Sequence, residues 1–179
     1  AGGRYVESAV MTSVPPYGLK VPMLLGGPHA SALAPILTAL GGDAKVVSPE
    51  IGVASAIKLC RSVIIKGIEA LVIESFTAAR AFGVEEHVLA SLAETYPTLD
   101  WEQQGDYYFS RVIQHGKRRA EEMQASAETV ASRGIEGTMA EAAARRQAYV
   151  AAHRAAGGFA DPLDVKPWRE RADELLRGK

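Results

Sequence analysis

The chain has 179 residues, of which 47% are hydrophobic and 23% charged, as in ordinary folded proteins with a hydrophobic core. Its formal net charge of −1 favours neither nucleic acid nor a membrane surface as a partner. A single cysteine, Cys60, excludes an internal disulfide and predicts a reducing, cytoplasmic location. The chain contains no uncharged apolar run of the roughly eighteen residues that a membrane-spanning helix needs.

The first fifty or so residues have an α/β pattern. Apolar runs predict strands over Arg4–Met11, Leu19–Leu25 and Ala44–Ser48, and helical spacing predicts a helix over His29–Leu40. Pro22 indicates that the second strand lies at a sheet edge or stops early, and Pro35 is unfavourable inside the helix. Because such a segment is too small to close its own core, we expect it to belong to a larger domain or to be completed by a partner.

A long helical stretch follows and dominates the chain. Gly52–Phe82 contains no proline, and as one helix it would be about 46 Å long at a rise of 1.5 Å per residue. Beyond it, helices are predicted over Val84–Tyr96, Trp101–Arg133, Thr138–Ala156 and Trp168–Arg177, with Gly105 and Gly116 as points where the second could break. The predicted fold is therefore an α/β segment followed by an all-helical part, joined by the long helix and mostly α overall.

Lys58 is the first candidate for chemistry, because it lies close to the start of the long helix. At 100° per residue, Arg61 and Ser62 lie within about 60° of it on the helix surface. A lysine near a helix N-terminus, where the helix dipole disfavours cations, suits a proton donor or acceptor at a carbonyl or alcohol carbon. Spacing alone, however, favours the simpler interpretation that Lys58, Arg61, Lys66 and Glu69 form a solvated amphipathic face.

Other polar residues carry weaker signals. Glu74 lies among apolar residues and is expected to be an internal partner for an arginine. The basic run His115–Arg119 suits either an anion site or, more commonly, a solvated helix face. Neither Cys60 nor the histidines have metal-ligand spacing, so no metal site is predicted. Because the sequence lacks a Gly-x-Gly-x-x-Gly turn, it does not carry the main phosphate site for a dinucleotide.

Four motifs stand in the order known from one enzyme family. YVESAVMTS ends a predicted strand, MLLGG closes the next on two glycines, GVASAIKLCRS opens the long helix with Lys58, and ESFTAARAFGV follows at the expected distance. The run from Tyr5 to Ala81 therefore resembles the β-hydroxyacid dehydrogenases, relatives of 6-phosphogluconate and 3-hydroxyisobutyrate dehydrogenases. The run HGKRRAEEM is most similar to a phosphogluconate-dehydrogenase-like branch of oxidoreductases.

The resemblance implies a domain organisation. Family members have an N-terminal Rossmann domain, a long interdomain helix and an all-helical C-terminal domain. Residues 1–51 would then be the C-terminal end of a Rossmann-type NAD(P)-binding domain, most of which this chain lacks. Residues 52–179 would be the all-helical domain. We therefore expect the 179-residue chain to bind a dinucleotide weakly or not at all.

The resemblance also implies roles for individual residues. Lys58 matches the catalytic lysine that acts as general acid and base, and Ile65 replaces the catalytic glutamate of true 6-phosphogluconate dehydrogenases, which argues against that chemistry. Substrate binding is implied for Met11, Thr12 and Ser13 in the substrate loop, for Ser62 in place of an asparagine with Arg61 beside it, and for Arg118 or Arg119 in place of a distal Lys-Asp pair. Gly52 matches the first glycine of the turn assigned to the cofactor.

The implied activity is that of an NAD- or NADP-dependent oxidoreductase. It would transfer hydride between the nicotinamide and a small hydroxy acid or a related carbonyl or imine, with the lysine exchanging a proton. The alternative is a catalytically inert helical fragment that serves for dimerisation, because the alanine-rich helices have more apolar face than one small domain can bury. Either reading predicts a homodimer through the helical part, with no nucleic-acid or membrane partner.

Overall fold

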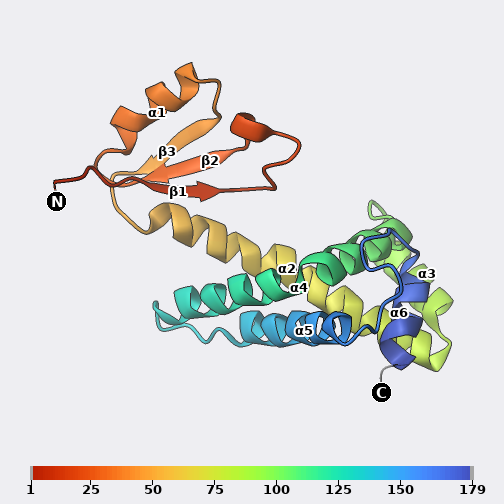
Figure 1. Cartoon of the computed structure of the whole chain (residues 1–179). Helices are drawn as coiled ribbons and strands as arrows, with labels where there is room; N and C mark the ends of the chain where they lie inside the picture. Colours follow the sequence, from red (N-terminus) through yellow and green to blue (C-terminus); the bar gives the residue numbers. More distant parts are fainter. Residues whose placement is uncertain (1, 178–179) are drawn as a thin grey trace. The chain divides into compact units, whose positions relative to one another are not determined.

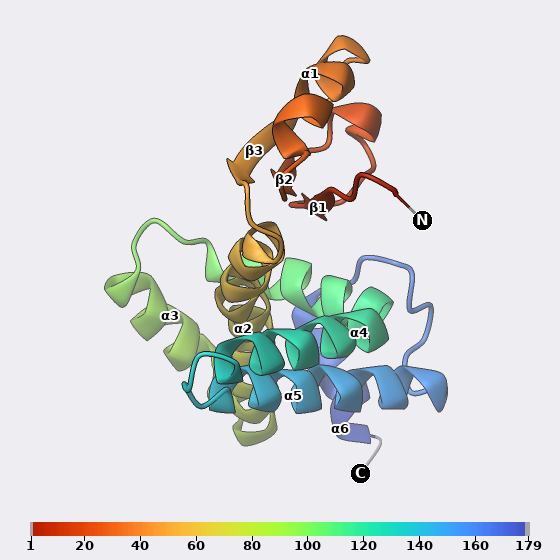
Figure 2. The ribbon, with the colours of Figure 1, turned by 90° about the vertical axis from the view of Figure 1, so that its left-hand side faces the viewer.

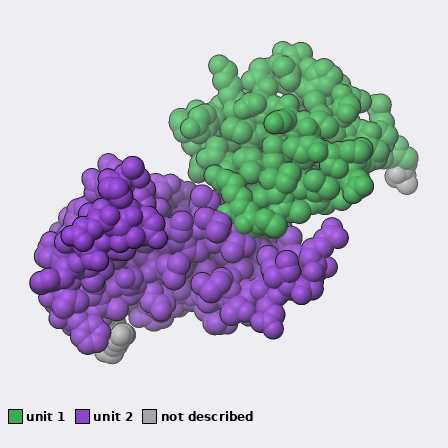
Figure 3. All heavy atoms as spheres, turned by 180° about the vertical axis from the view of Figure 1, so that it is seen from behind, with its two compact units in different colours: residues 1–61 green, residues 62–179 purple. Residues whose placement is uncertain are grey.

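The computed structural model describes residues 2–177, which divide into two compact units (Figure 3). The first unit spans Ala1–Arg61 and the second Ser62–Lys179. The division falls within the long helix α2, Val53–Phe82, which begins one residue after Gly52. The assignment of residues 1–51 to a Rossmann domain and 52–179 to a helical domain stays a prediction.

The first unit is built on a three-stranded sheet in the order β1-β2-β3 (Figure 1). The central strand β2 is antiparallel to β1 and parallel to β3, and helix α1 makes the crossover between the two parallel strands. Leu25 in β2 is completely buried. The elements are β1 (Glu7–Val10), the 3₁₀ turn η1 (Gly18–Lys20), β2 (Met23–Gly26), α1 (Ala30–Ala39) and β3 (Ala44–Ser48).

The expectation drawn from Pro22 is wrong, whereas the helix predicted across Pro35 is confirmed. The strand expected from Leu19 begins only at Met23, and it is central rather than at an edge. Pro22 lies just outside it, where its missing N–H removes no ladder hydrogen bond and its carbonyl still accepts the Met11 N–H at 2.9 Å. Pro35 lies inside α1 without ending it, because it is on the exposed side, where water can satisfy the carbonyl left unpaired.

The second unit is entirely helical, as expected. Helices α4 and α5 pack side by side in both views (Figures 1 and 2), and α6 packs on α4. Around 64% of the chain is helical, which confirms the predicted fold class. No helix within residues 2–177 is long and apolar enough to cross a membrane. Beyond α2, the helices are α3 (Glu85–Thr95), α4 (Trp101–Ala131), α5 (Thr138–Ala155) and α6 (Trp168–Arg177).

The aromatic core of this unit explains why α4 contains glycine. Phe76 of α2 and Phe109 of α4 lie against Trp168, with ring centroids 4.7 Å and 6.2 Å from it. A Cβ at Gly105 would lie 2.7 Å from the Trp168 ring, and one at Gly116 would lie 3.0 Å from the Gln147 carbonyl oxygen. The helix is continuous through both glycines, at which a break was possible, because both residues serve close packing instead.

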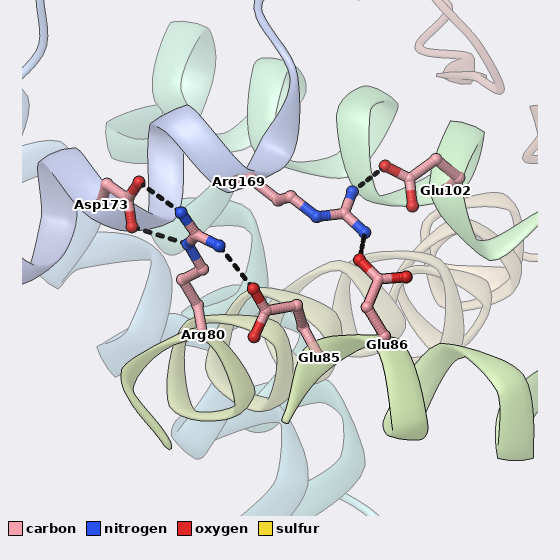
Figure 4. Close-up of polar contacts among 6 residues, drawn as sticks. All are labelled: Arg80, Glu85, Glu86, Glu102, Arg169 and Asp173. Atoms are coloured by element: carbon pink, nitrogen blue, oxygen red, sulfur yellow. Dashed lines mark hydrogen bonds and ion pairs between the residues drawn. The ribbon is translucent and has the colours of Figure 1, made fainter. Parts of the chain in front are cut away.

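Ion pairs hold the C-terminal helix in place (Figure 4). Arg80 of α2 donates to both carboxylate oxygens of Asp173, at 2.8 Å and 3.0 Å, and also pairs with Glu85. Arg169 bridges Glu86 of α3 and Glu102 of α4. These contacts join α2, α3 and α4 to α6.

Candidate functional site

Glu7 of β1 caps the N-terminus of α2. Its carboxylate accepts the backbone N–H of Gly52 at 2.8 Å and that of Ser55 at 3.1 Å, and the residue is only 7% exposed. Gly26 leaves the necessary space, because a Cβ there would lie 2.8 Å from a Glu7 carboxylate oxygen. A negative charge at a helix N-terminus satisfies free N–H groups and complements the helix dipole.

The surroundings of Glu7 keep it ionised. Burial alone would raise the pKa of this carboxyl, but hydrogen bonds from the Ser55 side chain and from the Gly52 and Ser55 amides lower the pKa below its usual value. The Gly52 amide is thereby committed to a carboxylate rather than to a phosphate. The Gly26-Gly27 turn packs against the side chains of Glu7 and Ile51. These residues do not fit the phosphates of a dinucleotide.

The other site residues predicted in the first unit lie on α2 near Lys58 or in the loop after β1. Lys58 lies in the second turn of α2, is half-buried, and has no hydrogen-bond or ion-pair partner among residues 2–177. Arg61 Nη1 donates to the Met11 carbonyl at 3.4 Å, which brings the predicted substrate loop to the same helix. Thr12 and Ser13 are exposed beside Met11.

In the second unit, α2 carries a buried polar stripe. Ser62, Lys66 and Glu69 follow each other at helical spacing, and all three are at least nine-tenths buried. The Lys66 ammonium donates to Ser62 Oγ at 3.0 Å and pairs with Glu122 of α4 at 2.7 Å. Glu69 pairs with Arg119 of α4 at 3.0 Å. The expectation of a solvated face is therefore wrong for Lys66 and Glu69, because α4 covers them.

This stripe is costly for stability. Burial raises the pKa of Glu69 although Arg119 and Lys66 oppose the shift, and burial lowers the pKa of Arg119 although Glu69 opposes it. Within the described chain, Glu69 Oε2 and Arg119 Nε lack hydrogen-bond partners. Apolar residues at these positions would often be as stable or more so. Buried, imperfectly satisfied charges with shifted pKa values are typical of functional sites.

The basic run on α4 separates into two faces. Arg119 is buried against Glu69, whereas Arg118 is exposed and pairs with Glu122 at 3.6 Å. Burial lowers the pKa of His115, and the positive charges of Arg111, Arg118 and other arginines nearby add to this effect. The structure therefore places Arg118 next to the Ser62–Lys66–Glu122 contacts and gives Arg119 an internal partner.

Glu74 has the arginine partner expected for it, but not the expected place. It pairs with Arg146 of α5, and its side chain is 62% exposed. In the range 2–177, no three His, Cys, Asp or Glu side chains lie close enough together to hold a metal ion.

The known proteins to which this chain is similar are themselves described as uncharacterised or hypothetical. Residues 79–150 match a domain of unknown function, DUF1932. A conserved hypothetical protein from Sinorhizobium meliloti 1021 has a similar structure, with a TM-score of 0.83 and 43% identity over 96% of this chain and 56% of that one. An uncharacterised 28.5 kDa protein in the 7S RNA 5′ region of Methanothermus fervidus is 29% identical over 123 residues, which are 67% of this chain and 46% of that protein.

One further solved structure bears on the fold family. It is that of the conserved protein MTH1747 of unknown function, described as structurally similar to 3-hydroxyacid dehydrogenases. The TM-score is 0.70 and the identity 32%, over 85% of this chain and 58% of that one. This chain thus shares its fold with a dehydrogenase-like protein. It spans about half the length of the relatives that it matches.

Sequence reasoning missed three residues of the site. Glu7 is an acidic residue inside an otherwise uncharged strand, and this position could have indicated that its carboxylate has a hydrogen-bond partner. Lys66 stands one turn after Ser62, but its burial depends on α4, which no local pattern specifies. Glu122 was hidden within the acidic end of the HGKRRAEEM run.

Proposed function

We propose that this chain belongs to an NAD(P)-dependent oxidoreductase of the β-hydroxyacid dehydrogenase type. Its reaction is hydride transfer between a nicotinamide cofactor and a hydroxy acid or a related carbonyl or imine. The observation that carries the proposal is the similarity, at 32% identity, to a protein whose structure resembles 3-hydroxyacid dehydrogenases. The order of motifs around Lys58 agrees with it.

Lys58 is the general acid and base of the proposed reaction. Its ammonium has no partner among the described residues, so it is not committed to a structural ion pair. When a hydroxyl carbon is oxidised, Lys58 takes the hydroxyl proton, and it returns a proton when a carbonyl is reduced. The absence of an ion-pair partner among the described residues and the half-buried position on α2 support this assignment over that of a solvated lysine.

The substrate contacts follow from the same resemblance. Met11, Thr12 and Ser13 form the substrate loop, which Arg61 contacts through the Met11 carbonyl. The resemblance also assigns Ser62 and one arginine of α4 to the substrate, and Arg118 is the better candidate because Arg119 is buried against Glu69.

NAD or NADP supplies the redox chemistry when bound. The Gly52 amide and the Gly26-Gly27 turn do not fit its phosphates, because the amide is already bound to the Glu7 carboxylate. The proposal therefore assigns substrate binding and proton transfer to this chain. The role of Gly52 in cofactor binding stays a prediction.

The test is oxidation and reduction of a panel of hydroxy acids and their carbonyl counterparts by the full-length gene product, with NAD and with NADP. Lys58→Ala should lower kcat by roughly a hundredfold to ten-thousandfold, the usual contribution of a general acid or base. Lys45→Ala, on an exposed lysine of β3, is the matched control and should leave kcat unchanged. Unchanged activity in Lys58→Ala would make this lysine structural.

A second candidate function is dimerisation by a catalytically inert helical domain. The second unit has an apolar groove of about 430 Å³ between α2 and α5. Ile64, Leu71 and Met139 line it and are 63%, 56% and 60% exposed. Large apolar side chains clustered in this way favour a protein partner, and a second copy of the chain is the simplest one. The homodimer is compatible with both functions.

A further inference from the structure

Ser62 stands in a chain of polar contacts that joins α2 to α4. We propose that Lys66 and Glu122 are positioning residues that hold the Ser62 hydroxyl as a hydrogen-bond donor to an oxyanion of the ligand, a carboxylate or a phosphate. The inference rests on the proposed function for the assignment of Ser62 to the substrate site. The contacts between Ser62, Lys66 and Glu122 are independent of it.

The direction of the hydrogen bond determines what Ser62 can offer. A lysine ammonium has only donors, so Lys66 Nζ donates to Ser62 Oγ over the 3.0 Å between them. The hydroxyl keeps one proton of its own to donate. No hydrogen bond within residues 2–177 uses that proton.

Other hydroxyl groups on the helices of this unit behave differently. Ser126 donates to the carbonyl of Glu122 one turn earlier at 2.9 Å, and Thr129 donates likewise to Ala125 at 2.9 Å. This back-bonding is the usual fate of serine and threonine inside a helix. Ser62 does not make it, so its hydroxyl proton has no acceptor among the described residues.

Lys66 is held firmly enough to set this direction. Its side chain is 9% exposed, and Glu122 binds the ammonium at 2.7 Å. The fully buried Gln147 of α5 donates to the backbone carbonyl of Lys66 at 3.1 Å, which fixes this turn of α2. The side chain thus has little freedom to release Ser62 or to turn into solvent.

The charges around the contact favour an anionic acceptor. Glu69 and Glu122 face a larger number of cationic side chains, namely Lys66, Arg111, Arg118 and Arg119. The ammonium of Lys66 also polarises the hydroxyl to which it donates. An ionised carboxylate or phosphate oxygen accepts hydrogen bonds, so it can take the proton that the Ser62 hydroxyl still has to donate. A cationic group on the ligand would be repelled by the positive side chains around Ser62.

The test measures ligand binding without a cofactor. Ligand-observed NMR relaxation on the full-length gene product compares glycolate with glycolamide, its neutral amide. Glycolate should bind, and glycolamide should bind at least roughly tenfold more weakly because it lacks the charge. Ser62→Ala should weaken glycolate binding by roughly tenfold to a hundredfold, the loss of one hydrogen bond to a charged group, and Ser62→Thr should keep the affinity.

Lys66→Met tests the positioning role. It should weaken glycolate binding as Ser62→Ala does, whereas Lys117→Met, on an exposed lysine of α4, should not. If Lys66→Met melts at a much lower temperature than the wild type, Glu122→Gln tests the positioning role instead and should weaken glycolate binding, because it removes the charge that holds the Lys66 ammonium. Equal binding of glycolate and glycolamide, or unchanged binding in Ser62→Ala, would overturn it.

Inorganic phosphate distinguishes the two oxyanions. Phosphate that displaces glycolate from the wild type shows that the site accepts either oxyanion, whereas the absence of displacement assigns it to a carboxylate. Failure of the proposed function gives a different result. Oxyanion binding that requires Ser62, in a protein without dehydrogenase activity, would support the site and contradict the proposed function. Turnover with an unchanged KM in Ser62→Ala would support the proposed function and contradict the site.

Discussion

Glu7 and Glu69 are both buried carboxyl groups, but their surroundings move their pKa values in opposite directions. Burial acts on Glu7 too, yet hydrogen bonds at the start of α2 outweigh it, so the pKa falls. At Glu69 burial outweighs the attraction of Arg119 and Lys66, so the pKa rises. The difference arises because Glu7 accepts two helix amides, whereas one oxygen of Glu69 has no hydrogen-bond partner in the described structure.

The cap at Glu7 should make the stability of the first unit sensitive to acid. Because the folded pKa lies below the ordinary value of 4.5, ionised Glu7 stabilises the fold above that pH, and the contribution is lost as pH falls through the folded pKa. Glu7→Gln should lower the free energy of unfolding at pH 7 by about 1–2 kcal/mol, as the loss of a helix cap does. The measurement is urea denaturation between pH 7 and pH 3.

The comparison between wild type and variant isolates this residue from other carboxylates. The difference in stability between wild type and Glu7→Gln should shrink as the pH falls below 4.5. Glu50→Gln, on an exposed residue next to the same helix start, should show no such difference. A gap that is constant with pH would contradict the ionised cap.

At the scale of elements, helices α2 and α4 are each continuous over about 30 residues, but their buried faces change character along their length. Toward its C-terminal end, α2 buries Ile73 and Phe76, whereas one to two turns earlier it buries Lys66 and Glu69. A helix has one backbone pattern whatever its side chains do, so it can carry a stable core and a polar site on the same stripe. On α4, Glu122 and Arg119 pair with Lys66 and Glu69 of this stripe.

Close packing at Gly105 should be visible in the stability of the second unit. A Cβ there would lie 2.7 Å and 3.0 Å from the rings of Trp168 and Phe76, so Gly105→Ala should lower the free energy of unfolding by about 1–2 kcal/mol despite the better helix propensity of alanine. Gly67→Ala, in α2 with nothing within 4 Å of the added Cβ, should raise it by about 0.5–1 kcal/mol. Thermal and urea unfolding measure both. A Gly105→Ala protein as stable as the wild type would show that the aromatic core can shift.

At the scale of the whole molecule, the second unit leaves an apolar surface that its own helices do not cover. The groove between α2 and α5 is lined almost entirely by apolar side chains, with the Glu74–Arg146 ion pair as its charged part. A homodimer that buries this groove would remove Ile64 and Leu71 from water, at about 25 cal/mol for each square ångström of apolar surface. This is the physical reason to expect self-association.

Sedimentation tests the homodimer. The wild type should sediment as a dimer, and Leu71→Glu should shift it to the monomer, because a charge in the groove would be buried without a partner. Ile36→Glu, on an exposed residue of α1 outside the groove, should leave the dimer intact. A wild type that is monomeric at all concentrations would contradict the interface.

The sequence by itself determined the helices, the order of the strands along the chain and the candidate role of Lys58. Helical periodicity and the positions of glycine and proline are local, so they can be read without knowledge of contacts, and the role of Lys58 came from a family's order of motifs. Only the tertiary structure decided the rest. Glu7 reaches Gly52 across 45 residues of sequence, and Lys66 is buried because α4 covers it. Burial and pairing are properties of distant segments brought together, and for that reason a helix face that looked solvated holds the buried polar contacts of the candidate site.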